Sequence, residues 1–116
     1  MKLRLPELKK ELKEEDIKPW TFWEDGKQKI YPVIDEEEAS IELSETTLWF
    51  GINNDEVGRL YGYVKINETN FLAYETLLIE TDYFDYTTKA QLKSAYKKCR
   101  KELLQRYREW VSQFYE

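Results

Sequence analysis

Apolar side chains recur at intervals of three and four residues through the C-terminal quarter of the chain. They fall at spacings of 4, 3, 4, 4, 3 and 4, which is the heptad-like seam of a helix. Thr88 and Gln91 stand at the spacing of a capping box at its start. The pattern predicts one long helix over residues 88–115, and its seam is formed by Leu92, Tyr96, Cys99, Leu103, Tyr107, Trp110 and Phe114.

Strand-like segments dominate the first two thirds of the chain. Residues 20–23 and 28–34 flank an Asp25-Gly26 pair, which suits the positive φ angles of a tight hairpin turn. Pro32 has no N–H to donate, so we expect the second of these strands at a sheet edge or a bulge. A hairpin over residues 20–34 is predicted.

Three further strands are expected between residues 40 and 81. The apolar residues Ile41 and Leu43 are at odd-numbered positions, whereas the apolar positions from Leu48 onward are even-numbered. A continuous strand would place these two sets on opposite faces, so residues 44–47 must contain a turn or a bulge. Polar loops at 53–58 and 67–70 separate the strands that follow. This spacing predicts an antiparallel meander.

The N-terminal segment 6–16 carries Pro6 at a first-turn position and a narrow stripe of Leu5, Leu8 and Leu12. It is predicted to be a short helix that is stable only when docked on the rest of the chain. The expected fold is one α+β domain over residues 1–116. It has an antiparallel meander of about five strands, this short N-terminal helix and the long C-terminal helix packed on one face.

Composition narrows the chemistry. The 116 residues include 35% charged and 16% aromatic residues, with a mean hydropathy of -0.77, which is typical of a single soluble domain. The chain has no histidine and one cysteine. A single chain therefore cannot form a His/Cys zinc site, an intramolecular disulfide or a histidine-based catalytic site. We expect a non-catalytic protein without a cofactor or a metal.

The single Cys99 and the lack of a secretory leader pattern favour a cytoplasmic location. Few Gly, Met, Cys, Asn and Gln, with many Lys and Glu, also lean toward a thermophilic origin, although a mesophilic protein with short loops would have the same composition.

Charge is divided unevenly along the chain. Residues 1–86 hold 10 basic and 20 acidic side chains, a net of -10, whereas residues 87–116 hold 8 and 3, a net of +5. The basic helix either neutralises carboxylates of its own domain or binds nucleic acid. The candidate nucleic-acid-binding residues are Lys93, Lys97, Arg100 and Lys101.

Aromatic residues suggest contact surfaces. If Leu60 and Val64 face the long helix, Tyr61 and Tyr63 lie on the opposite sheet face, where rings could stack bases or meet a protein partner. The far end of the helix would overhang the sheet and favour a homodimer or another partner. The candidate partner-binding residues are Trp49, Tyr61, Tyr63, Tyr74, Trp110, Phe114 and Tyr115.

Two acidic groups suggest further alternatives. Glu80, Asp82 and Asp85 could hold Mg²⁺ in a phosphoesterase, or could simply fill a turn before the helix. A second group could imitate a phosphate backbone, as inhibitors from viruses or mobile elements do; it consists of Asp35, Glu36, Glu37, Glu38, Glu42 and Glu45. The leading expectation is a small acidic interaction protein that binds a protein partner, with nucleic-acid binding by the basic helix as the alternative.

Overall fold

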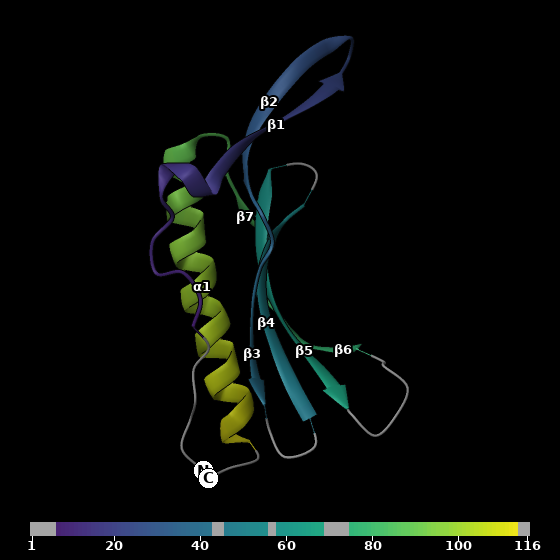
Figure 1. Cartoon of the computed structure of the whole chain (residues 1–116), viewed down its shortest axis with the longest axis vertical. Coiled ribbons are helices and arrows are strands. Elements are labelled where there is room, and N and C mark those ends of the chain that lie inside the picture. Colours follow the sequence, from purple (N-terminus) through teal and green to yellow (C-terminus); the bar gives the residue numbers. More distant parts are fainter. Residues whose placement is uncertain (1–6, 43–45, 56–57, 69–74, 114–116) are drawn as a thin grey trace.

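A five-stranded antiparallel sheet is covered on one face by a long helix, and a two-stranded hairpin projects from one end (Figure 1). The computed structural model describes residues 7–42, 46–55, 58–68 and 75–113. Within these ranges the elements are η1 (Glu14–Asp16), β1 (Ile17–Glu24), β2 (Lys27–Ile34), β3 (Glu37–Glu42), β4 (Thr46–Asn54), β5 (Arg59–Glu68), β6 (Glu75–Glu80), β7 (Phe84–Asp85) and α1 (Lys89–Ser112). The α+β class, with antiparallel strands and one long C-terminal helix, is confirmed.

Helix α1 begins where the capping box predicts. The Gln91 amide donates a 3.1 Å hydrogen bond to the Thr88 hydroxyl, and the Gln91 side-chain oxygen accepts from the Thr88 amide at 3.3 Å. The apolar seam is buried from Leu92 to Tyr107, and its next residue, Trp110, is half-buried. The helix and its core-facing seam are therefore confirmed as far as Ser112, while Phe114 and Tyr115 lie outside the described residues.

The main sheet is a meander in the order β3-β4-β5-β6, and β7 pairs with the first part of β5. The break predicted at residues 44–47 is placed too late, because β3 ends at Glu42 and β4 already begins at Thr46, so Thr46 and Thr47 are paired strand residues. Thr81 joins β6 to the centre of the sheet, because its amide donates to the Gly62 carbonyl at 2.9 Å and its hydroxyl accepts from the Gly62 amide at 2.8 Å.

The core lies between α1 and the inner face of the sheet. Leu48, Phe50 and Ile52 alternate inward on β4 as the parity predicts, and all three are fully buried. The Phe50 ring meets the Tyr107 ring edge to face, with centroids 4.7 Å apart. A methyl group at Gly62 would lie 3.2 Å from the Cys99 sulfur, so the missing side chain lets the helix approach the sheet closely.

The predicted N-terminal helix is wrong. Of residues 7–16, only Glu14–Asp16 form a single 3-10 turn, although Leu8 and Leu12 are buried as expected. In a helix the Lys9 carbonyl would accept from the Lys13 amide. Here the Tyr96 hydroxyl donates to that carbonyl at 2.7 Å, and the Lys13 amide donates to the Asp16 carboxylate at 2.9 Å. Tyr96 and Asp16 therefore bind the Lys9 carbonyl and the Lys13 amide, which would bond to each other in a helix.

The hairpin also differs from expectation, since β1 and β2 form a separate two-stranded sheet and do not extend the meander. After Ile34 the chain passes through Asp35 and Glu36 before β3 begins. The Asn54 side chain bonds both backbone groups of Ile34, donating to its carbonyl and accepting from its amide. A side-chain amide thus occupies the position where a neighbouring strand would continue the ladder.

Candidate functional site

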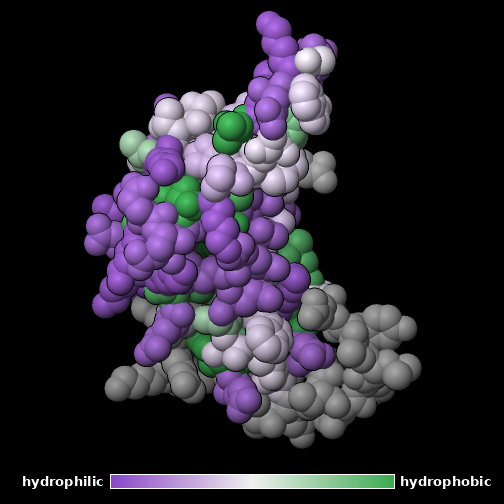
Figure 2. All heavy atoms as spheres, turned by 45° about the horizontal axis from the view of Figure 1, so that its top comes forward, coloured by the Kyte–Doolittle hydropathy of each residue, from purple (hydrophilic) through white to green (hydrophobic). Residues whose placement is uncertain are grey.

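The β1–β2 hairpin, called the arm below, extends away from the body (Figure 1) and projects beyond a surface that is largely hydrophilic (Figure 2). Its strands pair without a break from Ile17–Ile34 to Glu24–Lys27. Asp25 and Gly26 both have positive φ angles, of 52° and 72°, which is the two-residue turn that the sequence predicts.

One face of the arm stabilises the arm itself. Trp20 and Phe22 stack with ring centroids 5.0 Å apart, and Phe22 stacks on Tyr31 across the hairpin at 5.2 Å. Lys29 pairs with Glu24 at 2.6 Å on the same face. An isolated hairpin is marginal in water, and these cross-strand contacts supply the stabilisation that a third strand would otherwise give.

The opposite face of the arm carries no charge. Trp23 is 72% exposed and Ile30 is 64% exposed, and they are the most exposed large apolar side chains in the described part of the chain. In the pairing register every charged residue of β1 and β2 falls on the stacked face. The positions that point the other way between the buried base and the turn are Pro19, Thr21, Trp23, Gln28, Ile30 and Pro32.

The base of the arm is fixed to the body. Ile17 and Ile34 are buried in the core, and the Tyr31 ring lies against Gly58 in the turn before β5. Asn54 holds the backbone of Ile34, and the Tyr86 hydroxyl donates to the Asn54 side-chain oxygen at 2.8 Å. The arm therefore leaves the body in a defined direction.

The predicted ring face on the outer side of the sheet forms in part. Tyr61 and Trp49 are half-buried, and the indole N–H of Trp49 is buried without a hydrogen-bond partner in the described part of the chain. Tyr63 is only 3% exposed, because its ring lies over Gly51 and its hydroxyl donates to Glu36. Burial and this hydrogen bond raise the pKa of Tyr63 above its ordinary value. Tyr74 lies outside the described residues.

The helix end presents less apolar surface than expected. Tyr107 and Val111 are buried within the chain, and Trp110 is half-buried beside Tyr107, with ring centroids 6.4 Å apart. Up to residue 113, the seam needs no second chain to cover it. A homodimer formed through α1 remains a prediction, and sedimentation measurements test it.

The acidic run is partly engaged within the chain. Asp35 pairs with Lys18 at 2.6 Å, Glu36 accepts from Tyr63, and Glu37 accepts from Tyr96 at 2.6 Å. Glu38 and Glu42 are exposed on β3, an edge strand of the described sheet, where charge discourages pairing with other chains. Glu45 lies outside the described residues.

The basic residues of α1 separate into two groups. Glu14 pairs with Lys89 at 3.1 Å and with Lys93 at 3.4 Å, so the N-terminal segment neutralises the first turns of the helix. Arg100 is half-buried, and its Nε has no hydrogen-bond partner among the described residues. On α1, four exposed cations have no ion pair with any described residue, namely Lys97, Lys98, Lys101 and Arg108.

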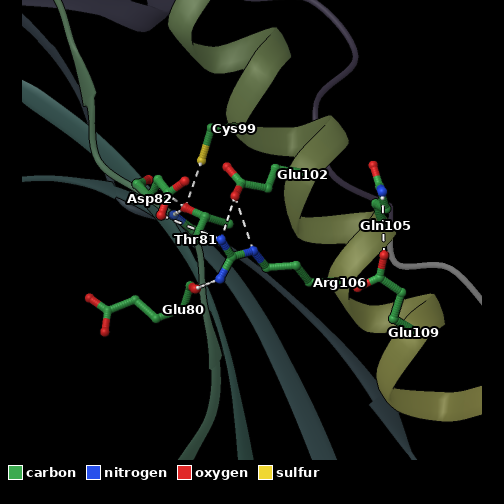
Figure 3. Close-up of polar contacts among 9 residues, drawn as sticks. Glu80, Thr81, Asp82, Cys99, Glu102, Gln105, Arg106 and Glu109 are labelled. Carbon is green, nitrogen blue, oxygen red and sulfur yellow. Dashed lines mark hydrogen bonds and ion pairs between the residues drawn. The ribbon is translucent and has the colours of Figure 1, made fainter. Parts of the chain in front are cut away.

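Arg106 ties the predicted acidic cluster to the helix (Figure 3). Its guanidinium donates to the Glu80 carbonyl at 2.8 Å, lies 3.4 Å from the Asp82 carboxylate and pairs with Glu102 at 2.6 Å. Among the described residues no three His, Cys, Asp or Glu side chains are placed to hold a metal ion. The structure does not bring Glu80, Asp82 and Asp85 together as the phosphoesterase hypothesis requires.

The exposed side chains of the arm are the feature that sequence reasoning missed. The sequence pattern predicts Trp20, Trp23 and Ile30 to be strand residues of the larger sheet. The available signal was that residues 17–23 and 30–34 are apolar on both parities, with a proline in each strand. In a two-stranded ribbon both faces are near solvent, so one apolar face is left without a partner.

Comparisons with protein-family models, curated proteins and solved structures found no significant match to this chain. Within the described residues there is no helix long and apolar enough to cross a membrane. The function is therefore inferred from the chemistry of the surface itself.

Proposed function

We propose that this chain is a non-catalytic binding protein that docks on an apolar surface of a protein partner through the uncharged face of the arm. The observation that carries the proposal is the exposure of Trp23 and Ile30 at 72% and 64% on a projecting hairpin. Large apolar side chains that gather on an exposed surface mark interaction sites in soluble proteins, whereas single ones need no explanation.

Energetics support a binding role for these two side chains. Burying a large apolar side chain contributes about 1.5–3 kcal/mol, and tryptophan is enriched among the residues that dominate binding energy. The rings of Trp20 and Phe22 are already stacked on the other face, so they are engaged in holding the arm together. Trp23 and Ile30 have no comparable role within the described part of the chain.

The chemistry of the face limits its partner. The alternate positions from Pro19 to Trp23 and from Gln28 to Pro32 include no cation, so this face has nothing to attract a phosphate backbone. A matching surface would be an uncharged apolar groove on a protein. Occupying that groove would exclude other ligands from it, which is how an inhibitor encoded by a virus or a mobile element would act.

Side chains, and not strand edges, are the proposed contact. In a hairpin with a two-residue turn, hydrogen-bonded and non-hydrogen-bonded residue pairs alternate along the two strands. The pair next to the turn, Glu24–Lys27, is hydrogen-bonded. The Pro19–Pro32 pair is five pairs further along and is therefore non-hydrogen-bonded. At such a pair the backbone N–H of any other residue would point away from the hairpin, toward a strand that could be added. Both prolines therefore remove outward donors, which discourages strand addition along the arm.

Site-specific crosslinking tests the proposal. A photoreactive benzoylphenylalanine at position 23 should crosslink one protein in the source cell, and the same probe at position 27, on the charged face, should not. The double variant Trp23→Ser/Ile30→Ser should weaken binding of the crosslinked protein by about thirtyfold or more. The matched control Lys27→Ser should bind like wild type. Equal binding by both variants would refute the role of the uncharged face.

Nucleic-acid binding by α1 is a second candidate, supported by Lys97, Lys98, Lys101 and Arg108, which are exposed and form no ion pair with any described residue. Filter binding across a salt series is the test. The pair Lys97→Glu/Lys101→Glu should reduce the salt slope by roughly one for each lost phosphate contact, and Lys93→Glu, already paired in the wild type, should change it less. Absence of retained DNA or RNA at low salt would eliminate this candidate.

A further inference from the structure

A groove of about 400 Å³ lies on the outer face of the sheet, the face opposite α1. Three tyrosine rings, one leucine and four polar side chains line it. These are Tyr61, Tyr63, Tyr83, Leu77, Asn53, Lys65, Glu36 and Glu80. Tyr83 and Leu77 are half exposed, so solvent reaches the rings. The groove is separate from the uncharged face of the arm.

Tyr61 is the central ring of this groove. Its centroid is 6.2 Å from that of Tyr63 at an interplanar angle of 41°, and 5.1 Å from that of Tyr83 at 48°. Rings tilted by these angles do not cover one another as flat stacks do. Tyr63 is only 3% exposed, so the accessible π surface of the groove belongs to half-buried Tyr61 and to Tyr83.

Carboxylates hold two of the three hydroxyl groups. The Tyr63 hydroxyl donates to Glu36, and the Tyr83 hydroxyl donates to Glu80 at 2.9 Å. The bond from Glu80 is the main cause that raises the pKa of Tyr83. A phenol that donates to a carboxylate gains electron density in its ring, and the carboxylates add negative charge at the groove. The first effect favours a cation over Tyr63 and Tyr83, and the second favours a further cation anywhere in the groove.

The chain already places its own cations on two of these rings. The Arg59 guanidinium lies 4.8 Å from the centroid of Tyr83, and the Lys65 ammonium lies 4.6 Å from that of Tyr63. Arg59 is also paired with Asp55 at 2.6 Å, which compensates its charge. Tyr61 lies between the two occupied rings and carries no cation from the described residues.

From this arrangement we infer that the groove binds a cationic side chain, lysine or arginine, of a basic segment on a partner protein, over Tyr61 and between Glu36 and Glu80. The wider field supports such an occupant, because residues 1–86 carry a net charge of -10, which attracts basic segments. This inference does not rest on the proposed role of the arm. The rings provide the contact and the two carboxylates provide the selectivity for positive charge.

Titrations of the full chain by amide NMR test this site with defined probes. N-acetyl-arginine amide and N-acetyl-lysine amide should cause saturable shifts at Tyr61, Leu77 and Glu80. The neutral probe N-acetyl-citrulline amide should cause no saturable shift. Equal binding of the neutral probe, or shifts confined to Glu38 and Glu42 on β3, would overturn the inference.

Variants then assign the binding to the ring and the charge. Tyr61→Leu should weaken binding of the arginine probe by about threefold to thirtyfold, the range expected for loss of a cation–π contact, and Tyr61→Phe should retain it. Glu80→Gln keeps the shape of the side chain and should also weaken binding. Trp23→Ser should have no effect, which separates this site from the arm. Unchanged binding in Tyr61→Leu and Glu80→Gln would refute the site.

Discussion

The Tyr96 hydroxyl donates a hydrogen bond of 2.7 Å to the backbone carbonyl of Lys9. A carboxylate oxygen of Glu37 lies 2.6 Å from the same hydroxyl, and a second oxygen of Glu37 accepts from the Lys9 amide. One buried tyrosine on α1 therefore joins the extended N-terminal segment and the first residue of β3. The residues involved are far apart in the sequence, so these bonds form only in the folded chain.

Removing this hydroxyl should destabilise the fold. We expect Tyr96→Phe to lower the free energy of unfolding by about 1–3 kcal/mol, because the Lys9 carbonyl and the Glu37 carboxylate share the single proton of this hydroxyl and both face it in the fold. Urea denaturation measures the change. As a control, Tyr83→Phe removes an exposed hydroxyl bonded to Glu80 and should cost much less. Equal stabilities of wild type and Tyr96→Phe would contradict this account.

Alkaline pH should lower the free energy of unfolding. Burial raises the pKa of Cys99 from an ordinary 9.0 to about 12 and that of Tyr86 from 10.0 to about 12, and it also raises the pKa values of Tyr63 and Tyr96. These groups bind protons more tightly in the folded chain than in the unfolded chain. Their contribution is complete below pH 9 and is lost as the pH rises through 9.0 to about 12.

Urea denaturation at a series of pH values tests this prediction. The free energy of unfolding should fall steadily above about pH 9, and the tyrosinate absorbance of the buried rings should rise together with unfolding. A Cys99→Ala variant should show a shallower fall just above that pH, because one of the protons involved is gone. A constant free energy of unfolding from neutral pH to about pH 11 would count against the burial of these groups.

The two faces of the arm should respond differently to truncation. Phe22→Ala removes the central ring of the stack, and each aromatic pair contributes about 0.5–1.5 kcal/mol beyond its burial. Amide hydrogen exchange in β1 and β2 should therefore accelerate by about tenfold or more, with little change in the main sheet. Trp23→Ala, on the exposed face, is the matched control and should leave exchange nearly unchanged. Equal acceleration in both variants would show that the faces are not distinct.

Sedimentation at micromolar concentration tests the predicted homodimer. A species of twice 14.1 kDa that Trp110→Glu dissociates would support association through α1. A clean 14.1 kDa species would refute it. Because Trp110 also packs beside Tyr107, the folding of the variant must be checked by circular dichroism. Loss of helicity in the variant would assign Trp110 to the core of the single chain.

Local signals explain what the sequence could predict. The Thr88–Gln91 capping box and the regular seam define α1 without help from other segments, so its start and its buried face were predictable. The parity change between Ile41 and Leu48 likewise located the break between β3 and β4. Both signals lie within a few residues of the structure that they determine.

Long-range contacts explain the errors. The N-terminal segment has a helical pattern, but Tyr96 and Asp16 take the backbone groups that a helix would use. Parity placed Tyr61 and Tyr63 on the outer face, yet the burial of Tyr63 depends on Gly51 in the neighbouring strand. Nothing near residue 63 in the sequence indicates that pairing.

The candidate sites show the same division. Tyr61 was predictable from alternation along β5, whereas Tyr83 reaches the groove from the segment between β6 and β7 and has no periodic signal. Trp23 and Ile30 have ordinary strand patterns. Their exposure follows from the separation of the hairpin from the meander, at the point where Asn54, twenty residues beyond Ile34, bonds the backbone of Ile34.

Beside the buried Ile17 and Ile34 and the packing of Tyr31 against Gly58, Asn54 also fixes the arm to the body. Its carboxamide is bonded to the last residue of the hairpin on one side and to Tyr86, just before α1, on the other. Replacing half-buried Asn54 would therefore change the orientation of the arm relative to the body without altering any side chain at its tip.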